Sequence, residues 1–171
     1  MTGLTRPRDA LAIGLALGGV FSVLNVVSAS IAPLADDTLP ALAAFYGPMF
    51  LAWGLAGFGA ARSTGRPLVG LKTGALVAFG TFVVLTIAVI VRVNLSLPVM
   101  TRRPDWQNLI ARFNGSGFDS LRTYVNYEYL KGAPFKILVA STIGAVCGFL
   151  GACTTRAFRR RIIGPSGGFR L

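Results

Sequence analysis

The sequence predicts an all-α integral membrane protein, a four-transmembrane-helix bundle with one or two amphipathic interfacial helices between spans three and four. Of its 171 residues, 53% are hydrophobic and only 13% are charged, whereas soluble domains carry about 25% charged residues. The mean hydropathy is +0.64. Four apolar stretches each reach the length of about 20 residues that crosses a bilayer core. These properties exclude a soluble globule, a disordered tail and a nucleic-acid-binding module, despite the formal net charge of +11.

The first expected span is uncharged throughout, and the third and fourth carry basic residues only at their ends. The apolar run of the first span is longer than the 7–15 residues typical of a signal-peptide core. We therefore expect this span to remain in the protein and not to be cleaved as a signal peptide. Each stretch is apolar all round, as a lipid-embedded helix should be. We expect spans at about residues 10–31, 42–61, 71–91 and 135–155, with an outer loop at 93–134.

Charge predicts the orientation of the bundle. Asp36 and Asp37 lie between the first two spans without a neighbouring basic residue, and the charges of the 93–134 loop are mixed. Ten of the 17 basic residues fall on the opposite side: Arg6, Arg8, Arg62, Arg66, Lys72, Arg156, Arg159, Arg160, Arg161 and Arg170. By the positive-inside rule, both the 1–9 segment and the basic 157–171 tail are cytoplasmic. We also expect the membrane to be a bacterial cytoplasmic (inner) membrane, and the basic tail to contact anionic lipid and no nucleic acid.

The long loop contains two helical patterns. Pro104 suits the first turn of a helix, and the four apolar residues after it are spaced i, i+3, i+4 and i+7. A second helix is expected at 119–131, with residues 132–134 ending it before the fourth span. Their aromatic and aliphatic residues suit a membrane interface, a partner-docking surface or a ligand-binding lid. The residues concerned are Trp106, Leu109, Ile110, Phe113, Tyr124, Tyr127 and Tyr129.

A polar stripe interrupts the first span. Ser22, Asn25 and Ser28 are spaced i, i+3 and i+6 and share one helix face. A polar stripe in a span forms an interhelical hydrogen bond or contacts a pigment, quinone, lipid or channel lumen.

A ridge of small residues follows the fourth span. Ala140, Gly144, Gly148 and Ala152 recur every fourth residue. Such a ridge lets helices approach closely, either inside the bundle or against another subunit or copy.

Catalytic groups are scarce. Histidine is absent, and Cys147 and Cys153 are spaced too far apart on one helix for a disulfide. No ionisable residue falls near mid-span. We therefore predict no catalytic site, metal or cofactor.

The sequence favours a non-catalytic structural or accessory subunit of a larger membrane complex, which contacts the bilayer and either partner subunits or copies of itself. The alternative is a small transporter or channel component that uses the polar stripe. A membrane enzyme or a lipid- or quinone-handling protein would draw instead on polar residues of the outer loop: Arg102, Arg103, Asp105 and Tyr127.

Overall fold

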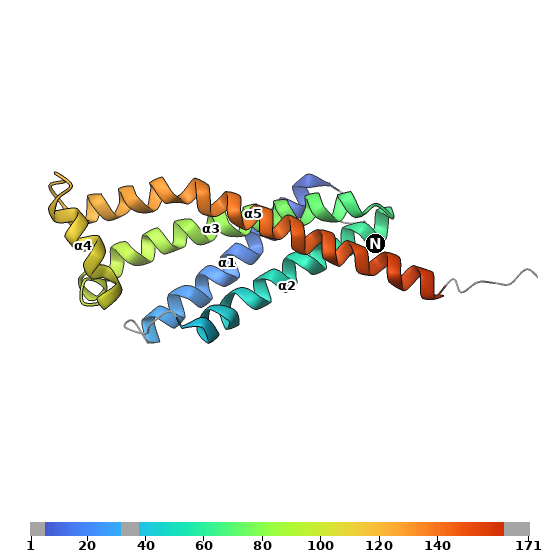
Figure 1. Cartoon of the computed structure of the whole chain (residues 1–171), viewed down its shortest axis with the longest axis horizontal. Helices are drawn as coiled ribbons and strands as arrows, with labels where there is room; N and C mark the ends of the chain where they lie inside the picture. Colours follow the sequence, from blue (N-terminus) through green and yellow to red (C-terminus); the bar gives the residue numbers. More distant parts are fainter. Residues whose placement is uncertain (1–5, 32–37, 163–171) are drawn as a thin grey trace, which may run out of the picture.

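The computed structural model describes the backbone of residues 6–31 and 38–162, and side chains within these ranges as far as Thr155. Within them the chain is helical, without a strand. Four long helices carry the structure (Figure 1): α1 (Pro7–Ile31), α2 (Leu39–Thr64), α3 (Pro67–Met100) and α5 (Leu121–Ile162). All four are long and apolar enough to cross a membrane. This confirms the predicted all-helical class with four candidate spans. Asp36, Asp37 and the 163–171 end of the basic tail lie outside the described residues.

The helices alternate in direction, so the chain passes up and down through the bundle (Figure 1). Gly65 ends α2 in a left-handed conformation, with φ 69°, and its N–H donates to the carbonyl of Ala61 at 2.7 Å. This is the usual glycine ending of a helix. Pro67 then begins α3. Proline has no backbone N–H, and at the first position of a helix this group would have no hydrogen-bond partner within the helix. A tight turn therefore joins α2 and α3 at one end of the bundle.

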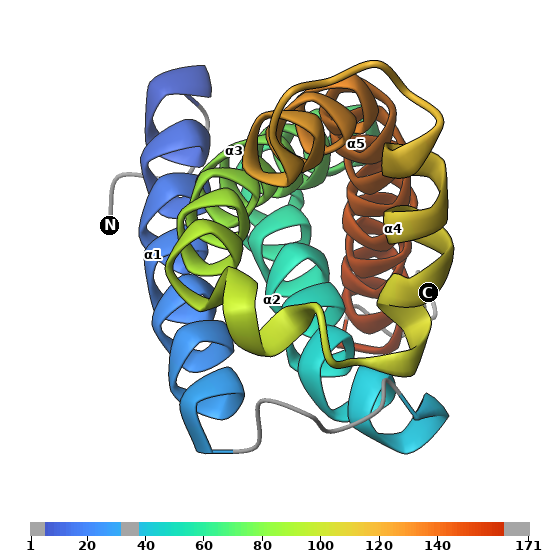
Figure 2. The ribbon, with the colours of Figure 1, turned by 90° about the vertical axis from the view of Figure 1, so that its left-hand side faces the viewer.

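The opposite end is closed by the short 3-10 helix η1 (Pro104–Trp106) and by α4 (Gln107–Asn114). Figure 2 views the molecule from this end, which we call the α4 end. The connection from α3 to α5 lies at the α4 end.

One predicted boundary was wrong: residues 132–134 do not separate two helices, because α5 runs unbroken through Pro134. In addition, α3 continues beyond the expected third span, as far as Met100. The 119–131 helix is the beginning of α5. The ends of α3 and α5 pack together in a second core, which outweighs the local break signals; it buries Val93, Met100, Trp106 and Val125.

The lengths of α3 and α5 show that both extend past a single span. With 34 and 42 residues, they measure about 51 and 63 Å at 1.5 Å per residue. The hydrocarbon core of a bilayer is about 30 Å thick. The second core lies between α3 and α5 in the parts of these helices nearest the α4 end.

The main core lies where α3 contacts α1, α2 and α5. Trp53 is fully buried there, and its indole N–H donates to the Thr81 hydroxyl at 3.4 Å. The Thr81 hydroxyl donates in turn to the carbonyl of Val77 at 2.7 Å. Both polar groups are thereby paired within the apolar core, as burial requires. Large apolar side chains cover much of the outer surface, among them Leu24, Leu55, Leu138 and Leu150.

Candidate functional site

A cavity of about 530 Å³ lies between α1, α2, α3 and α5. Ligand pockets typically measure about 300–1,000 Å³. One part of its wall is apolar and includes Phe45, Phe82, Leu85 and Val89. The polar and charged part is formed by Asn25, Ser28, Tyr46, Thr86, Arg92, Ser96, Arg103, Tyr129 and Lys136.

The cavity lies toward the α4 end. Arg92 follows the start of α3 by 25 residues, a rise of about 38 Å, which exceeds the thickness of about 30 Å of the hydrocarbon core. Asn25 follows the start of α1 by 18 residues, or about 27 Å. The cavity therefore lies in the half of the bundle nearest the α4 end.

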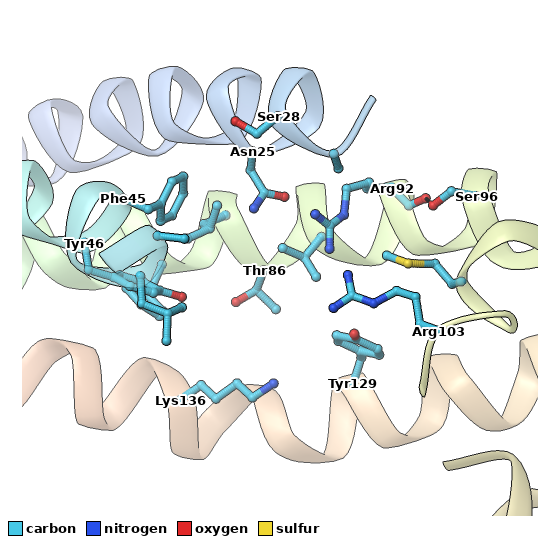
Figure 3. A pocket seen from close by; sticks show the side chains of 17 residues that line it. Asn25, Ser28, Phe45, Tyr46, Thr86, Arg92, Ser96, Arg103, Tyr129 and Lys136 are labelled. Atoms are coloured by element: carbon cyan, nitrogen blue, oxygen red, sulfur yellow. Dashed lines mark hydrogen bonds between the residues drawn. The ribbon is translucent and has the colours of Figure 1, made fainter. Parts of the chain in front are cut away.

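Three cationic side chains converge in this space. Figure 3 shows the guanidinium groups of Arg92 and Arg103 and the amine of Lys136 pointing into the same part of the cavity. Arg92 and Lys136 come from α3 and α5, and Arg103 follows α3 directly. The antiparallel packing of α3 and α5 therefore brings together charges that are far apart in sequence.

The three cations have different surroundings. Arg103 is 9% exposed and donates to Asp105 twice, from Nε to Oδ1 at 2.9 Å and from Nη2 to Oδ2 at 3.1 Å. The Nζ of Lys136 lies 5.2 Å from the centre of the Tyr129 ring, a cation–π contact. The Nε of Arg92 is buried and has no hydrogen-bond partner. Among the described residues, no carboxylate lines the cavity.

The polar stripe of α1 is divided between two environments. Asn25 and Ser28 line the cavity, and Figure 3 shows the Asn25 amide pointing into it, toward Arg92. The Asn25 Oδ1 is buried without a hydrogen-bond partner. Ser22 is 8% exposed, does not line the cavity, and its hydroxyl oxygen also lacks a partner. The stripe therefore contributes two residues to the cavity and one to the packed interior.

The small-residue ridge of α5 packs inside the bundle. A Cβ atom added at Gly144 would meet the backbone of Gly74 and the methyl group of Ala78, and one added at Gly148 would meet the backbones of Gly70 and Gly74. Ala140 and Ala152 are also buried. Contacts with α2 and α3 occupy this face of α5.

The aromatic residues near the α4 end do not form one exposed surface. Trp106 is 7% exposed and Tyr124 is 5% exposed; the Tyr124 ring contacts Phe113 at a centroid distance of 5.8 Å. Tyr129 lines the cavity, whereas Tyr127 is exposed beside Lys131. Leu109, Ile110 and Phe113 are partly exposed on α4.

The four outer-loop polar residues considered for an enzyme do not converge. Arg103 pairs with Asp105, Arg102 is exposed, and Tyr127 packs against Phe118 at a centroid distance of 5.3 Å. Of the four, only Arg103 lines the cavity. Within the described residues, no group of three or more His, Cys, Asp or Glu side chains could hold a metal ion.

Sequence reasoning missed two features of this region. Arg92 and Lys136 stood at the ends of expected spans and were interpreted as groups that reach for the interface. Asn94 and Asn126 were not singled out, although their amides exchange hydrogen bonds of 2.6 and 3.3 Å between α3 and α5. Only the pairing of α3 with α5 could have revealed either arrangement.

These features define a helical membrane protein with a partly polar cavity among its candidate spans. Comparison of the chain with protein-family models, curated proteins and solved structures finds no match.

Proposed function

We propose that this chain is a non-catalytic integral membrane protein that binds an amphipathic molecule from the bilayer in the cavity among α1, α2, α3 and α5. The observation that carries the proposal is the two-part wall of the cavity. Its apolar part includes Phe45, Phe82 and Leu85, while the cationic groups of Arg92, Arg103 and Lys136 converge in another part. A molecule with an apolar body and a polar end matches both parts. Such binding is compatible with two roles: a small carrier of the bound molecule, and an accessory subunit that holds a lipid.

The proposed membrane placement follows from charge. Arg62, Arg66 and Lys72 are exposed around the turn between α2 and α3. We place this end at the cytoplasmic face of a bacterial inner membrane, by the positive-inside rule. The start of α1 and the end of α5 lie at the same end of the bundle (Figure 1). The α4 end then faces the outside, with α4 as an amphipathic helix at the outer interface.

Photocrosslinking tests the binding proposal. The protein is reconstituted with a mixture of anionic and zwitterionic phospholipids that carry a diazirine in the acyl chain, and crosslinked peptides are mapped by mass spectrometry. We expect crosslinks at the cavity wall, on the peptides that contain Phe45 and Phe82. Thr86→Phe fills part of the cavity and is expected to remove them.

Ala16→Phe is the matched control, since Ala16 is exposed on α1 and does not line the cavity. It adds the same ring to a lipid-facing position and should leave the crosslinks unchanged. Crosslinks spread evenly over outer residues such as Leu55 and Leu150, and insensitive to Thr86→Phe, would overturn the proposal.

An accessory-subunit role is the second candidate, and the partly exposed face of α4 favours it. None of the residues of α4 is buried, although Leu109, Ile110 and Phe113 are apolar. A partner subunit packed there would cover these side chains. Purification of tagged protein from its native membrane, followed by native mass spectrometry, should then yield a stoichiometric partner that Ile110→Ser releases and Ala111→Ser retains. Recovery of the chain alone, or only with copies of itself, would contradict this role.

A further inference from the structure

We infer that residues 39–47 of α2, which we call the gate segment, form a movable wall of the cavity that swings about Pro48 to admit a molecule from the bilayer. The inference rests on the proposed function and adds the step by which the cavity is filled. It predicts that the rate of binding depends on Pro48, a residue that does not line the cavity.

Pro48 divides α2 into two parts with different surroundings. The buried residues of α2 all follow this proline: Met49, Trp53, Ala56, Gly57, Ala60 and Ala61. The residues by which α2 lines the cavity all precede it: Ala41, Leu42, Phe45 and Tyr46. Every residue from 39 to 44 is exposed. One part of the helix is therefore built into the packed bundle, and the other part forms the cavity wall.

The turn before Pro48 is the place where α2 bends most easily. Proline has no backbone N–H, so the carbonyl of Ala44 loses its hydrogen bond within the helix, and the proline ring crowds the same turn. Gly47 precedes the proline, and a Cβ atom added there would meet no atom within 4 Å. Glycine lowers the stability of a helix interior, and sharp bends in helices occur mostly at proline.

The part of α2 after Pro48 is anchored to α5 by backbone contacts. A Cβ atom added at Gly57 would meet the backbone of Gly148, and one added at Gly151 would meet the backbone of Gly54. Closely packed elements of this kind resist displacement. The anchored part therefore stays in place when the gate segment moves.

The ring contacts of the gate segment are made by side chains. The Phe45 ring contacts the Phe21 ring of α1 edge to face at a centroid distance of 5.7 Å, and the Tyr46 ring stacks on Phe82 of α3 at 6.5 Å. Among the described residues, α1 packs mainly on α3 and makes little contact with α2. Rotation about Pro48 that separates these rings widens the cavity on its α2 side.

Time-resolved photocrosslinking tests the inference. The purified chain in detergent micelles is mixed with diazirine-bearing phosphatidylglycerol and phosphatidylcholine and irradiated after increasing delays. The crosslink yield is read on the peptide that contains Phe82. Pro48→Ala restores the missing N–H and removes the crowding, so the helix remains formed and becomes stiffer. We expect it to slow the appearance of the crosslink at least about threefold and to leave the final yield unchanged.

Pro134→Ala is the matched control. Pro134 is also an exposed proline inside a long helix, and it does not line the cavity. Its replacement makes the same chemical change in α5 and should leave the rate unchanged.

A covalent bridge between α1 and the gate segment provides a second test. Phe21→Cys and Phe45→Cys are combined in a chain whose native cysteines are replaced by alanine, and dibromobimane, a short reagent, links the two thiols. A bridge formed before lipid is added should slow the appearance of the crosslink at least about tenfold, because the gate segment cannot swing. The unbridged variant lacks both rings and should fill faster than the unmodified chain.

Two results would overturn the inference. Equal rates in the unmodified chain, in Pro48→Ala and in the bridged variant, at full final yield, would show that the wall does not move; the proposed binding of amphiphiles would stand. Equal slowing by Pro48→Ala and Pro134→Ala would show that the hinge is not at Pro48. Absence of cavity crosslinks at every delay in the unmodified chain would remove the proposed function, and the gate with it.

Discussion

Gly148→Ala introduces a methyl group where α5 packs directly on the backbone of α3. The new Cβ would lie 2.9 Å from the Cα of Gly74 and 3.1 Å from its N, and closer still to the carbonyl oxygen of Gly70. Comfortable contacts between carbon atoms are about 3.5–4.0 Å. Because both neighbours are backbone, no side chain can rotate away. The two helices must therefore separate by roughly 1 Å.

The expected cost follows from two opposing effects. Overpacking of a tight contact costs about 1–3 kcal/mol, and a contact between two backbones belongs near the upper end. Replacing glycine by alanine in a helix gains about 0.5–1 kcal/mol. We expect Gly148→Ala to lower the free energy of unfolding by about 1–2 kcal/mol, the difference between these estimates.

Gly132→Ala on the same helix separates the two effects. The nearest neighbour of the added Cβ would be the Cε of Lys136, one turn along the same helix, at 3.9 Å, an ordinary contact. This substitution should leave stability unchanged or raise it by up to about 1 kcal/mol. Unfolding by SDS in mixed micelles, followed by the fluorescence of Trp53 and Trp106, measures both variants. If Gly148→Ala proves as stable as Gly132→Ala, the contact between α3 and α5 is looser than the structure indicates.

Two further predictions concern polar groups. Asn126→Ala removes both hydrogen bonds between the two amides and leaves the Asn94 Nδ2 only the carbonyl of Ile90. It should lower the free energy of unfolding by about 1 kcal/mol, whereas replacing both asparagines by leucine should cost less. Additive losses in the SDS titration would contradict this pairing. With both native cysteines replaced by alanine, Ser28→Cys should react from the α4 side with a membrane-impermeant thiol reagent, because Ser28 is exposed. Ser22→Cys should not, because Ser22 is buried, and equal labelling of the two would contradict the division of the polar stripe.

The sequence was sufficient for the four apolar helices because their signal is local: a run of apolar residues long enough to span a bilayer specifies a helix by itself. It was insufficient for the ends of α3 and α5. There the apolar run stops, but the helices continue because Val93 and Val125 are buried against the same cluster. Pro134 lies at an exposed position inside α5, and the preceding residue, Ala133, is buried. Packing between residues that are distant in sequence decided these boundaries.

The cavity depended still more on distant contacts. Asn25 and Ser28 were singled out as a polar face of one helix, and the structure places both at the cavity wall. The cationic end could not be derived in the same way, since Arg92 and Lys136 belong to different helices. Their convergence depends on the register that aligns Asn94 with Asn126.

The position of the cavity follows from the sizes of the residues at the two ends of the bundle. Toward the α2–α3 turn, Gly57, Gly70 and Gly148 permit backbone contact between α2, α3 and α5. Toward the α4 end, aromatic rings separate the helices: Phe21 contacts Phe45 at a centroid distance of 5.7 Å, and Tyr46 stacks on Phe82 at 6.5 Å. An aromatic ring between two helices holds them several ångströms further apart than a glycine does. Helices that touch at one end therefore diverge toward the other, as α1 and α2 diverge from α3 and α5 (Figure 1). The divergence opens a space where the cationic side chains gather. The small residues and the aromatic residues are therefore two parts of one arrangement that forms the cavity.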